Sequence, residues 1–242
     1  MNKNSNTYQI LYAAVMVVLV GTALAFIYMS LKPRQDENIA NDKRRQILSA
    51  VHVTVPEDSI RDAYKQYITA GMVVDQQGEP VDTTLEAAFA VDMSKENKLP
   101  ADQRKRPVFV GTMTDGSTKY IIPVYGAGLW GPIWGYIALN DDGNTIYGAN
   151  FSHQGETPGL GARITEDAFQ QEFVDKRLYK NDQFLSVEIV KQGQKPTNDA
   201  DYVDAISGAT ITSRGVGSMM HSGLELYDGF LKKLQNNDTN NQ

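Results

Sequence analysis

The chain has 242 residues, a length that accommodates one domain or two small ones. With 41% hydrophobic residues and 20 glycines it has the composition of a globular protein, and its net charge of −6 argues against a nucleic-acid-binding surface, which needs clustered basic residues. Because the chain contains no cysteine, disulfides, cysteine-ligated metal sites and cysteine nucleophiles are excluded.

The first element along the chain is an apolar segment. Residues Ile10–Leu31 are 22 consecutive residues without a charge, enough for a helix across the ~30 Å core of a bilayer. A cleaved signal peptide has a shorter apolar region, whereas Tyr12 and Tyr28 lie near the two ends of this one, as interfacial aromatic residues do. We expect a retained transmembrane helix over residues 10–31, preceded by a short N-terminus of residues 1–9.

Helical patterns follow this span. Residues 37–51 and 57–68 carry apolar residues at helical spacing, and Pro56 stands where a helix begins. We therefore expect a helical stalk over residues 32–70. The chain then becomes polar, and between residues 71 and 107 only 72–74 and 87–91 resemble strands, so we expect an irregular insertion there.

From residue 108 onward, short strands alternate with turn residues. Strands are predicted over 108–112, 119–125, 135–139, 145–149 and 184–190, and helices over 166–176, with Thr165 as N-cap, and 213–234. Asp115-Gly116 and Asp142-Gly143 are typical hairpin turns. Residues 235–242 are expected to be a disordered tail. The fold class is therefore predicted as α+β: one N-terminal transmembrane helix, then one soluble domain, residues 71–234, with an antiparallel sheet and flanking helices.

Two glycine-rich clusters interrupt the predicted strands. Residues 126–135 (GAGLWGPIWG) hold both tryptophans of the chain, which either line a site for a planar heterocycle or fill the core. Residues 153–161 (HQGETPGLG) offer Glu156 and Thr157 as hydrogen-bonding groups, or are a solvated loop. His153 and Glu156 without a third ligand do not make a zinc site, so no metal is expected.

A third cluster, residues 204–213 (DAISGATITS), directly precedes the last predicted helix. The first backbone N–H groups of a helix are unpaired, so an anion can bind there. Gly208 permits a tight turn, and the small Ala209 lets a bulky group approach the backbone. An ordinary capping turn, with Thr212 or Ser213 as N-cap, accounts for the same pattern. The P-loop spacing is missing.

Together the three clusters resemble the FMN-binding domain family of Na⁺-pumping NADH:quinone reductases and Rnf complexes. The resemblance rests on Asp204-x-x-Ser207-Gly208-Ala209-Thr210, on ETPGLG at Glu156–Gly161 and on GLW at Gly128–Trp130. In that family FMN is joined through its phosphate to the last threonine of the first motif, which corresponds to Thr210. The resemblance places the remaining cofactor-binding residues near the phosphate (Ser207, Gly208 and Thr212, with Asp204 and Ala209 in the same motif) or near the flavin ring (Leu129, Trp130, Glu156, Thr157, Leu160 and Gly161).

Within the family, the layout is most similar to the C-subunit branch of the Na⁺-pumping reductases, because of the basic stalk and the long polar insertion. The alternatives are the G-subunit branch of Rnf complexes and a membrane-anchored scaffold without cofactor. The resemblance implies a covalent FMN, attached by a flavin transferase, that relays electrons in a six-subunit translocase with subunits A, B, D, E and F. That complex oxidises NADH, reduces ubiquinone and exports Na⁺. The GxGxxG string at residues 126–131 stands between two predicted strands and does not open a helix, as a dinucleotide-binding motif does, and the span holds no Asp, Glu, Lys, Arg or His. No complete active site and no catalytic residue are therefore expected on this chain alone.

Two arguments about membrane orientation disagree. More Lys and Arg residues follow the span than precede it, so the positive-inside rule puts the domain in the cytoplasm. That rule weakens for long translocated domains, and the resemblance implies a periplasmic domain on a single-pass anchor in the bacterial inner membrane. We expect the periplasmic orientation.

Overall fold

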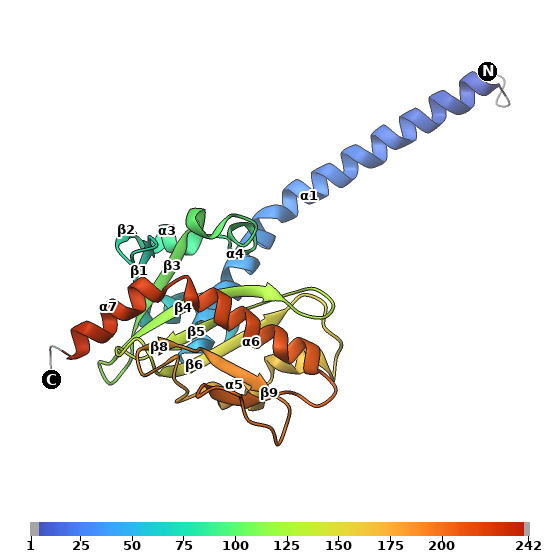
Figure 1. The fold of residues 1–242 in the computed structure, drawn as a ribbon. Helices are drawn as coiled ribbons and strands as arrows, with labels where there is room; N and C mark the ends of the chain where they lie inside the picture. Colours follow the sequence, from blue (N-terminus) through green and yellow to red (C-terminus); the bar gives the residue numbers. More distant parts are fainter. Residues whose placement is uncertain (1–4, 240–242) are drawn as a thin grey trace. The chain divides into compact units, whose positions relative to one another are not determined.

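A computed structural model describes residues 5–239 of the chain (Figure 1). The chain divides into two units, Met1–Lys43 and Arg44–Gln242, which are described separately. Residues 1–4 of the expected N-terminus and residues 240–242 of the expected tail lie outside the described residues.

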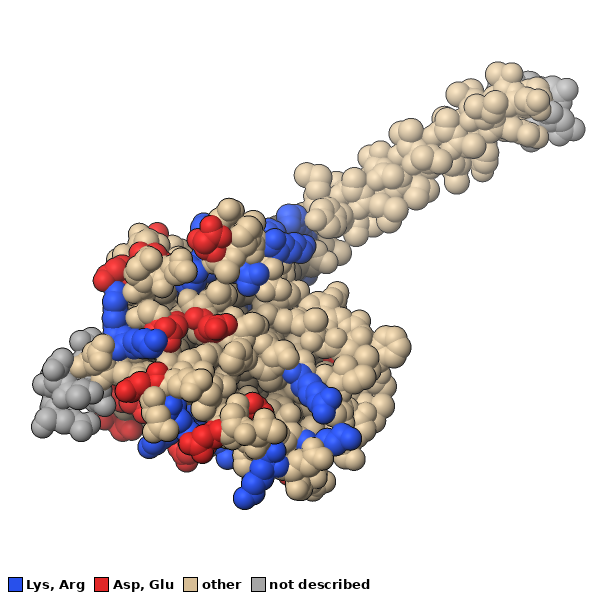
Figure 2. Space-filling model, in the orientation of Figure 1, with Lys and Arg blue, Asp and Glu red and all other residues tan. Residues whose placement is uncertain are grey.

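The first unit is made by helix α1, which runs from Asn6 to Ala50 and continues into the second unit. The most apolar window of α1 has a mean hydropathy of 2.6 and no buried residue, so the helix is long and apolar enough to cross a membrane. Figure 2 shows no charged side chain along this stretch on the face viewed. The predicted span and the first stalk helix form one continuous helix, and Pro33 lies inside it without breaking it. An ion pair between Lys32 Nζ and Asp36 Oδ1, at 3.3 Å, joins the two sides of Pro33 across one helical turn.

The second unit is built on a six-stranded sheet in the order β2-β1-β3-β4-β5-β6. All neighbouring strands pair antiparallel, as the sequence predicts. The strands of this sheet are β1 (Ile68–Val74), β2 (Pro80–Asp82), β3 (Arg106–Thr112), β4 (Thr118–Ala127), β5 (Pro132–Leu139) and β6 (Ile146–His153). The β3–β4 and β5–β6 turns contain Gly116 and Gly143, whose φ angles of 83° and 61° are left-handed and suit glycine.

Helices and short strands complete the domain. The helices after α1 are α2 (Ile60–Tyr67), α3 (Leu85–Ala90), α4 (Met93–Glu96), α5 (Asp167–Gln170), α6 (Thr210–Glu225) and α7 (Asp228–Thr239), with 3-10 turns at Glu57–Ser59, Ala101–Gln103, Gly161–Thr165 and Gln171–Phe173. The short strands are β7 (Tyr179–Lys180), β8 (Gln183–Phe184), β9 (Val187–Val190) and β10 (Asp201–Asp204).

Both faces of the sheet are buried, because its central strands carry apolar residues at successive positions. On β3, Val108 belongs to one core cluster and Phe109 to the other, and on β4 Ile122 and Ile121 divide in the same way. The first cluster includes the apolar stripe of α6, and the second includes the end of α1 together with α2 and α3. The sheet is therefore the middle layer of three.

Helix α6 lies directly against β4 (Figure 1), because glycines stand at the contact. A Cβ atom at Gly126 would be 2.7 Å from Met219 Cβ, and one at Gly215 would be 2.6 Å from the Ala127 carbonyl oxygen. A Cβ atom at Gly223 would be 2.9 Å from Val124 Cγ1. This close packing puts the first turns of α6 beside the turn that joins β4 to β5.

The first half of the domain differs from its predicted organisation. Residues from Arg44 onward belong to the second unit, so the end of the expected stalk is part of the core. The strand expected at residues 72–74 is the end of β1, which begins at Ile68 within the expected stalk and pairs with β3, so the start of the expected irregular insertion belongs to the sheet. Residues 87–91, predicted as a strand, lie mostly in α3, because the Thr84 side chain caps that helix by accepting the Ala87 N–H at 3.3 Å.

The elements predicted between residues 166 and 190 also differ from the structure. The helix predicted over 166–176 ends at Phe173, because Asp175 adopts a left-handed φ of 64°. Thr165 is not its N-cap: its hydroxyl donates to the Ala162 carbonyl oxygen at 2.9 Å instead. The strand predicted over 184–190 is divided by Ser186, with φ 59°, and β9 pairs in parallel with β10, which the sequence pattern missed.

The helix predicted over 213–234 is two helices, α6 and α7, separated near Tyr227. The fully buried Tyr227 hydroxyl donates to the Pro107 carbonyl oxygen at 3.1 Å, and this contact fixes the chain between the two helices. Helix α7 continues to Thr239, so the part of the expected tail that is described is helical rather than disordered.

Candidate functional site

The three glycine-rich clusters meet at the start of α6. The first forms the turn between β4 and β5, closed by the Gly128 N–H, which donates to the Gly131 carbonyl oxygen at 2.8 Å. The second is the loop that leaves β6, and the third leads from β10 into α6. Three segments that are far apart in the sequence thus form one surface.

The Glu156 carboxylate joins the three clusters. Glu156 is only 4% exposed. Its Oε1 accepts the Trp130 backbone N–H at 2.8 Å, and its Oε2 accepts the Thr212 hydroxyl at 2.7 Å. Its own N–H donates to His153 Nδ1 at 3.2 Å. Each oxygen of one buried carboxylate therefore holds a different cluster by a charge-assisted hydrogen bond.

Gly128 and Gly161 make room for this carboxylate. A Cβ atom at Gly128 would overlap Glu156 Oε1, and a Cβ atom at Gly161 would overlap Oε2 and lie 2.7 Å from Thr212 Oγ1. Neither glycine has a positive φ, so close approach rather than backbone conformation excludes a side chain there.

The third cluster does not form the capping turn that was one alternative. Helix α6 begins at Thr210 with Ala209 as N-cap, and no side chain accepts at this cap. The Ser213 hydroxyl instead donates to the Ala209 carbonyl oxygen at 2.9 Å and accepts the Ile206 N–H at 3.1 Å. Thr212 is engaged with Glu156. The first turn of α6 thus keeps unpaired N–H groups at the positive end of the helix dipole.

Four large apolar side chains from these clusters are exposed. Leu129 is 48% exposed, Trp130 69%, Leu160 45% and Ile211 61%. A Cβ atom at Gly208 would be 3.0 Å from Leu160 Cδ2, so Leu160 lies over the turn before α6, where Gly208 has φ 80°. Exposed apolar side chains that gather in one place mark a binding surface.

A hollow of about 200 Å³ adjoins the third cluster and is lined in part by Asp204 and Ser207. Its one cation, Arg163, is paired with Glu166 at 3.0 Å, and Glu172 accepts the Asp204 N–H at 3.2 Å. Because carboxylates outnumber the cation, the first turn of α6 suits a phosphate better than this hollow does.

The predicted site residues all belong to the clusters that meet here, but in two layers. Exposed or half-buried residues form the surface, namely Leu129, Trp130, Thr157, Leu160, Asp204, Ser207, Gly208 and Thr210. Buried residues support it from beneath, namely Glu156, Gly161, Ala209 and Thr212. Ile211, which belongs to the exposed apolar surface of the site, was not predicted from the sequence. It is an apolar residue of α6 that lies outside the buried apolar stripe of that helix. Among residues 5–239, no group of three or more His, Asp or Glu side chains could hold a metal ion.

The FMN-binding domain family matches residues 128–225, which extend from the β4–β5 turn to the end of α6. The apolar helix, the sheet and the three clusters therefore define a membrane-anchored protein with an FMN-binding domain. The C subunit of the Na(+)-translocating NADH-quinone reductase of Pseudomonas aeruginosa is 33% identical over 255 residues, covering 97% of this chain and 98% of its own. The chain belongs to the NqrC family, the C subunits of Na⁺-translocating NADH-quinone reductases.

Other relatives agree with this assignment. The same subunit of Vibrio vulnificus is 31% identical over 212 residues, covering 82% of this chain and 81% of its own. The solved structure of the C subunit from Parabacteroides distasonis superposes with a TM-score of 0.77 at 45% identity, over 83% of this chain and 96% of that one. The solved structure of Shewanella oneidensis NqrC gives a TM-score of 0.68 at 27% identity, over 81% and 98%.

Proposed function

We propose that this subunit relays electrons through an FMN joined covalently, by a phosphoester, to Thr210. The observation that carries the proposal is the position of Thr210: it is half-buried at the first residue of α6, in a helix start without a side-chain cap. A phosphodiester there keeps one negative charge, which the helix N-terminus stabilises by about 0.3–1 kcal/mol.

The surrounding residues fit an FMN. Leu129, Trp130, Leu160 and Ile211 offer exposed apolar surface for the planar flavin ring, and Thr157 offers a hydroxyl. When bound, the FMN supplies the redox chemistry. The chain orients the ring, shields part of it from water, and holds the phosphate at the start of α6. The Glu156 carboxylate acts from beneath, because it fixes Trp130 and Thr212 relative to each other.

We infer that the subunit works in a complex with subunits A, B, D, E and F that oxidises NADH, reduces ubiquinone and exports Na⁺, and that a flavin transferase attaches the FMN. The names of the relatives support this role and favour it over that of the G subunit in Rnf complexes. The FMN-binding domain match favours a flavoprotein over a scaffold without cofactor.

We further propose that the domain is periplasmic and the anchor spans the bacterial inner membrane once. An alkaline phosphatase fused after Gln242 should be active in intact cells. An inactive phosphatase, together with a fluorescent cytoplasmic reporter fused at the same position, would show that the positive-inside rule holds instead.

The attachment is tested by Thr210→Ala in cells that make the flavin transferase. After denaturing electrophoresis, the wild-type chain should fluoresce under ultraviolet light and the Thr210→Ala chain should be dark. Ser218→Ala is the matched control, because it removes an exposed hydroxyl from the same helix while leaving Thr210 and the hydrogen bonds of Ser213 in place. A fluorescent Thr210→Ala chain would overturn the proposal.

A further inference from the structure

A second feature of the domain is the buried side chain of Arg106, the first residue of β3. Arg106 is 3% exposed. Its Nη1 donates to the Arg104 carbonyl oxygen at 3.1 Å and its Nη2 to the Ala101 carbonyl oxygen at 2.7 Å. Its Nε–H has no hydrogen-bond partner within residues 5–239, and none of the ion pairs found there includes Arg106.

Such a guanidinium is unfavourable without a counter-ion. Two neutral carbonyl groups accept hydrogen bonds from it but do not neutralise its charge, and buried charges in proteins are normally paired. Nearly all buried donors in native proteins are also satisfied by protein, water or an ion. Arg106 therefore calls for an acceptor that the chain itself does not supply.

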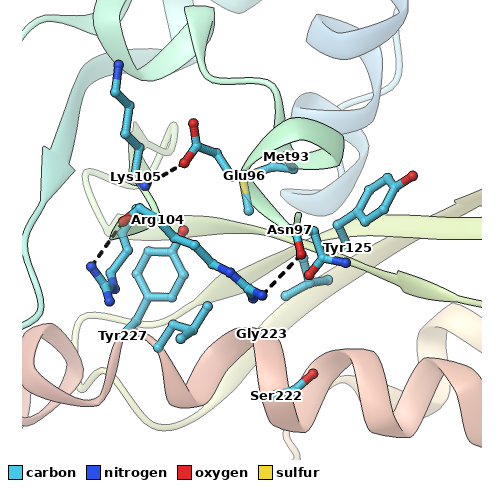
Figure 3. A pocket seen from close by; sticks show the side chains of 12 residues that line it. Met93, Glu96, Asn97, Arg104, Lys105, Tyr125, Ser222, Gly223 and Tyr227 are labelled. Atoms are coloured by element: carbon cyan, nitrogen blue, oxygen red, sulfur yellow. Dashed lines mark hydrogen bonds between the residues drawn. The ribbon is translucent and has the colours of Figure 1, made fainter. Parts of the chain in front are cut away.

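Arg106 lines a cavity of about 20 Å³ between α4, the segment before β3, β4 and the second half of α6. Figure 3 shows the Arg104 side chain reaching across this cavity toward Asn97, beside the ring of Tyr227. The volume holds one water-sized sphere, so a water molecule or a monatomic ion fits, and a phosphate or a carboxylate does not.

The charged groups around the cavity are mainly positive. The Arg104 and Arg106 guanidinium groups stand against one lining carboxylate, Glu96, whose Oε2 accepts the Lys105 backbone N–H at 2.8 Å, while the exposed Lys105 side chain points away from the cavity (Figure 3). Arg104 donates only to carbonyl oxygens, those of Leu99 at 2.8 Å and Asn97 at 3.1 Å. Burial raises the pKa of one of the two lining tyrosines, Tyr227, so its phenol stays neutral. An excess of one positive charge in a small cavity favours an anion over water.

We propose that this cavity binds a halide-sized monovalent anion, chloride under physiological conditions, on the Arg106 Nε–H. The anion neutralises the buried guanidinium and ties the segment from α4 to β3 to the second half of α6. Since α6 begins at Thr210, the anion stabilises the helix that carries the proposed attachment site. The proposal does not depend on the flavin.

The first test compares thermal unfolding of the full chain, in detergent micelles, in sodium chloride and in sodium gluconate at equal ionic strength. Chloride at ten times its Kd should raise Tm by about 3–6 °C, with a saturable dependence, whereas gluconate is too large to enter. Arg106→Met should abolish the difference between the salts, and Lys195→Met, at an exposed cation away from the cavity, should keep it. Equal Tm values for the wild-type chain in both salts would overturn the proposal in favour of a buried water.

A second test does not use Arg106→Met and decides the matter if that variant does not fold. Crystals of the full chain grown in sodium bromide should show an anomalous peak in the cavity within hydrogen-bond distance of Arg106 Nε. Arg104→Met should lower the height of that peak, because it removes one of the lining charges. A cavity without anomalous signal in the wild-type crystals would refute the anion site.

Discussion

Replacing Glu156 by alanine removes the carboxylate that joins the three clusters. It removes two hydrogen bonds to a charged acceptor, at 2.8 and 2.7 Å, each of which contributes about 1.5–3 kcal/mol. The Thr212 side chain is 1% exposed, so its hydroxyl is left without a partner, whereas water can reach the Trp130 turn. The loss of the Trp130 hydrogen bond therefore counts for less than the loss of the Thr212 hydrogen bond, and we expect the free energy of unfolding to fall by about 3 kcal/mol in all.

Glu156→Gln is the matched control. Its amide oxygen can accept the Trp130 N–H while its amide N–H donates to the Thr212 hydroxyl, which accepts as readily as it donates. Both hydrogen bonds then remain and only the charge is lost, so the expected decrease in the free energy of unfolding is about 1 kcal/mol.

The assay is urea unfolding of the flavin-free full chain in detergent, followed by tryptophan fluorescence, since the chain has 2 Trp residues and one of them is Trp130. A double-mutant cycle between Glu156→Ala and Thr212→Val should give a coupling of about 1–2 kcal/mol. A loss below about 0.5 kcal/mol for Glu156→Ala, or a coupling near zero, would refute the reasoning.

Two further variants test the packing and the charges around the site. Gly161→Ala pushes a methyl group into the Glu156 carboxylate and should lower the free energy of unfolding by about 1–3 kcal/mol in the same urea assay, whereas Gly155→Ala meets no atom within 4 Å and should have little effect. Asp201 tests pH dependence: burial acts to raise its pKa, but the Arg177 N–H at 2.7 Å and the Lys180 ammonium at 3.0 Å outweigh burial and hold the pKa below its ordinary value. The ionised Asp201 carboxylate stabilises the fold fully above the ordinary Asp pKa, and this stabilisation is lost as the pH falls through the lower pKa of the folded state. Asp201→Asn should therefore lower the urea midpoint at pH 7 and match the wild type in strong acid. An equal difference at both pH values would contradict the assignment.

The sheet could be predicted from the sequence because its signals are local. Period-two apolar patterns and the Asp-Gly turns at residues 115–116 and 142–143 act over a few residues, and β3 to β6 lie where those signals place them. The strand at residues 72–74 was predicted, but the polar composition of residues 71–107 hid its place in the sheet, because its pairing with β3 depends on residues more than thirty positions away.

Helix ends were predicted less well, because tertiary contacts determine them. The break between α6 and α7 depends on the hydrogen bond of Tyr227 to Pro107, 120 residues earlier in the chain. No periodic pattern within residues 213–234 carries that information, and the helical stripe continues through the break.

The candidate site shows the same division. Glycine and small polar residues marked the three clusters individually, and the family resemblance joined them. The buried position of Glu156 could not be read from the sequence, because its partners Trp130 and Thr212 are 26 and 56 residues away. A carboxylate in a polar loop is normally solvated, and only the fold places this one beneath the surface.

The most direct test of the account is localisation of the flavin by peptide fragmentation in a mass spectrometer. The wild-type chain, made with a flavin transferase, is digested and the peptide that contains residues 207–213 is fragmented. The account predicts a mass increment of FMN less one water on fragments that include Thr210, and none on fragments that carry only Ser207, Thr212 or Ser213. An increment on another residue, or an unmodified peptide from flavin-containing protein, would contradict it.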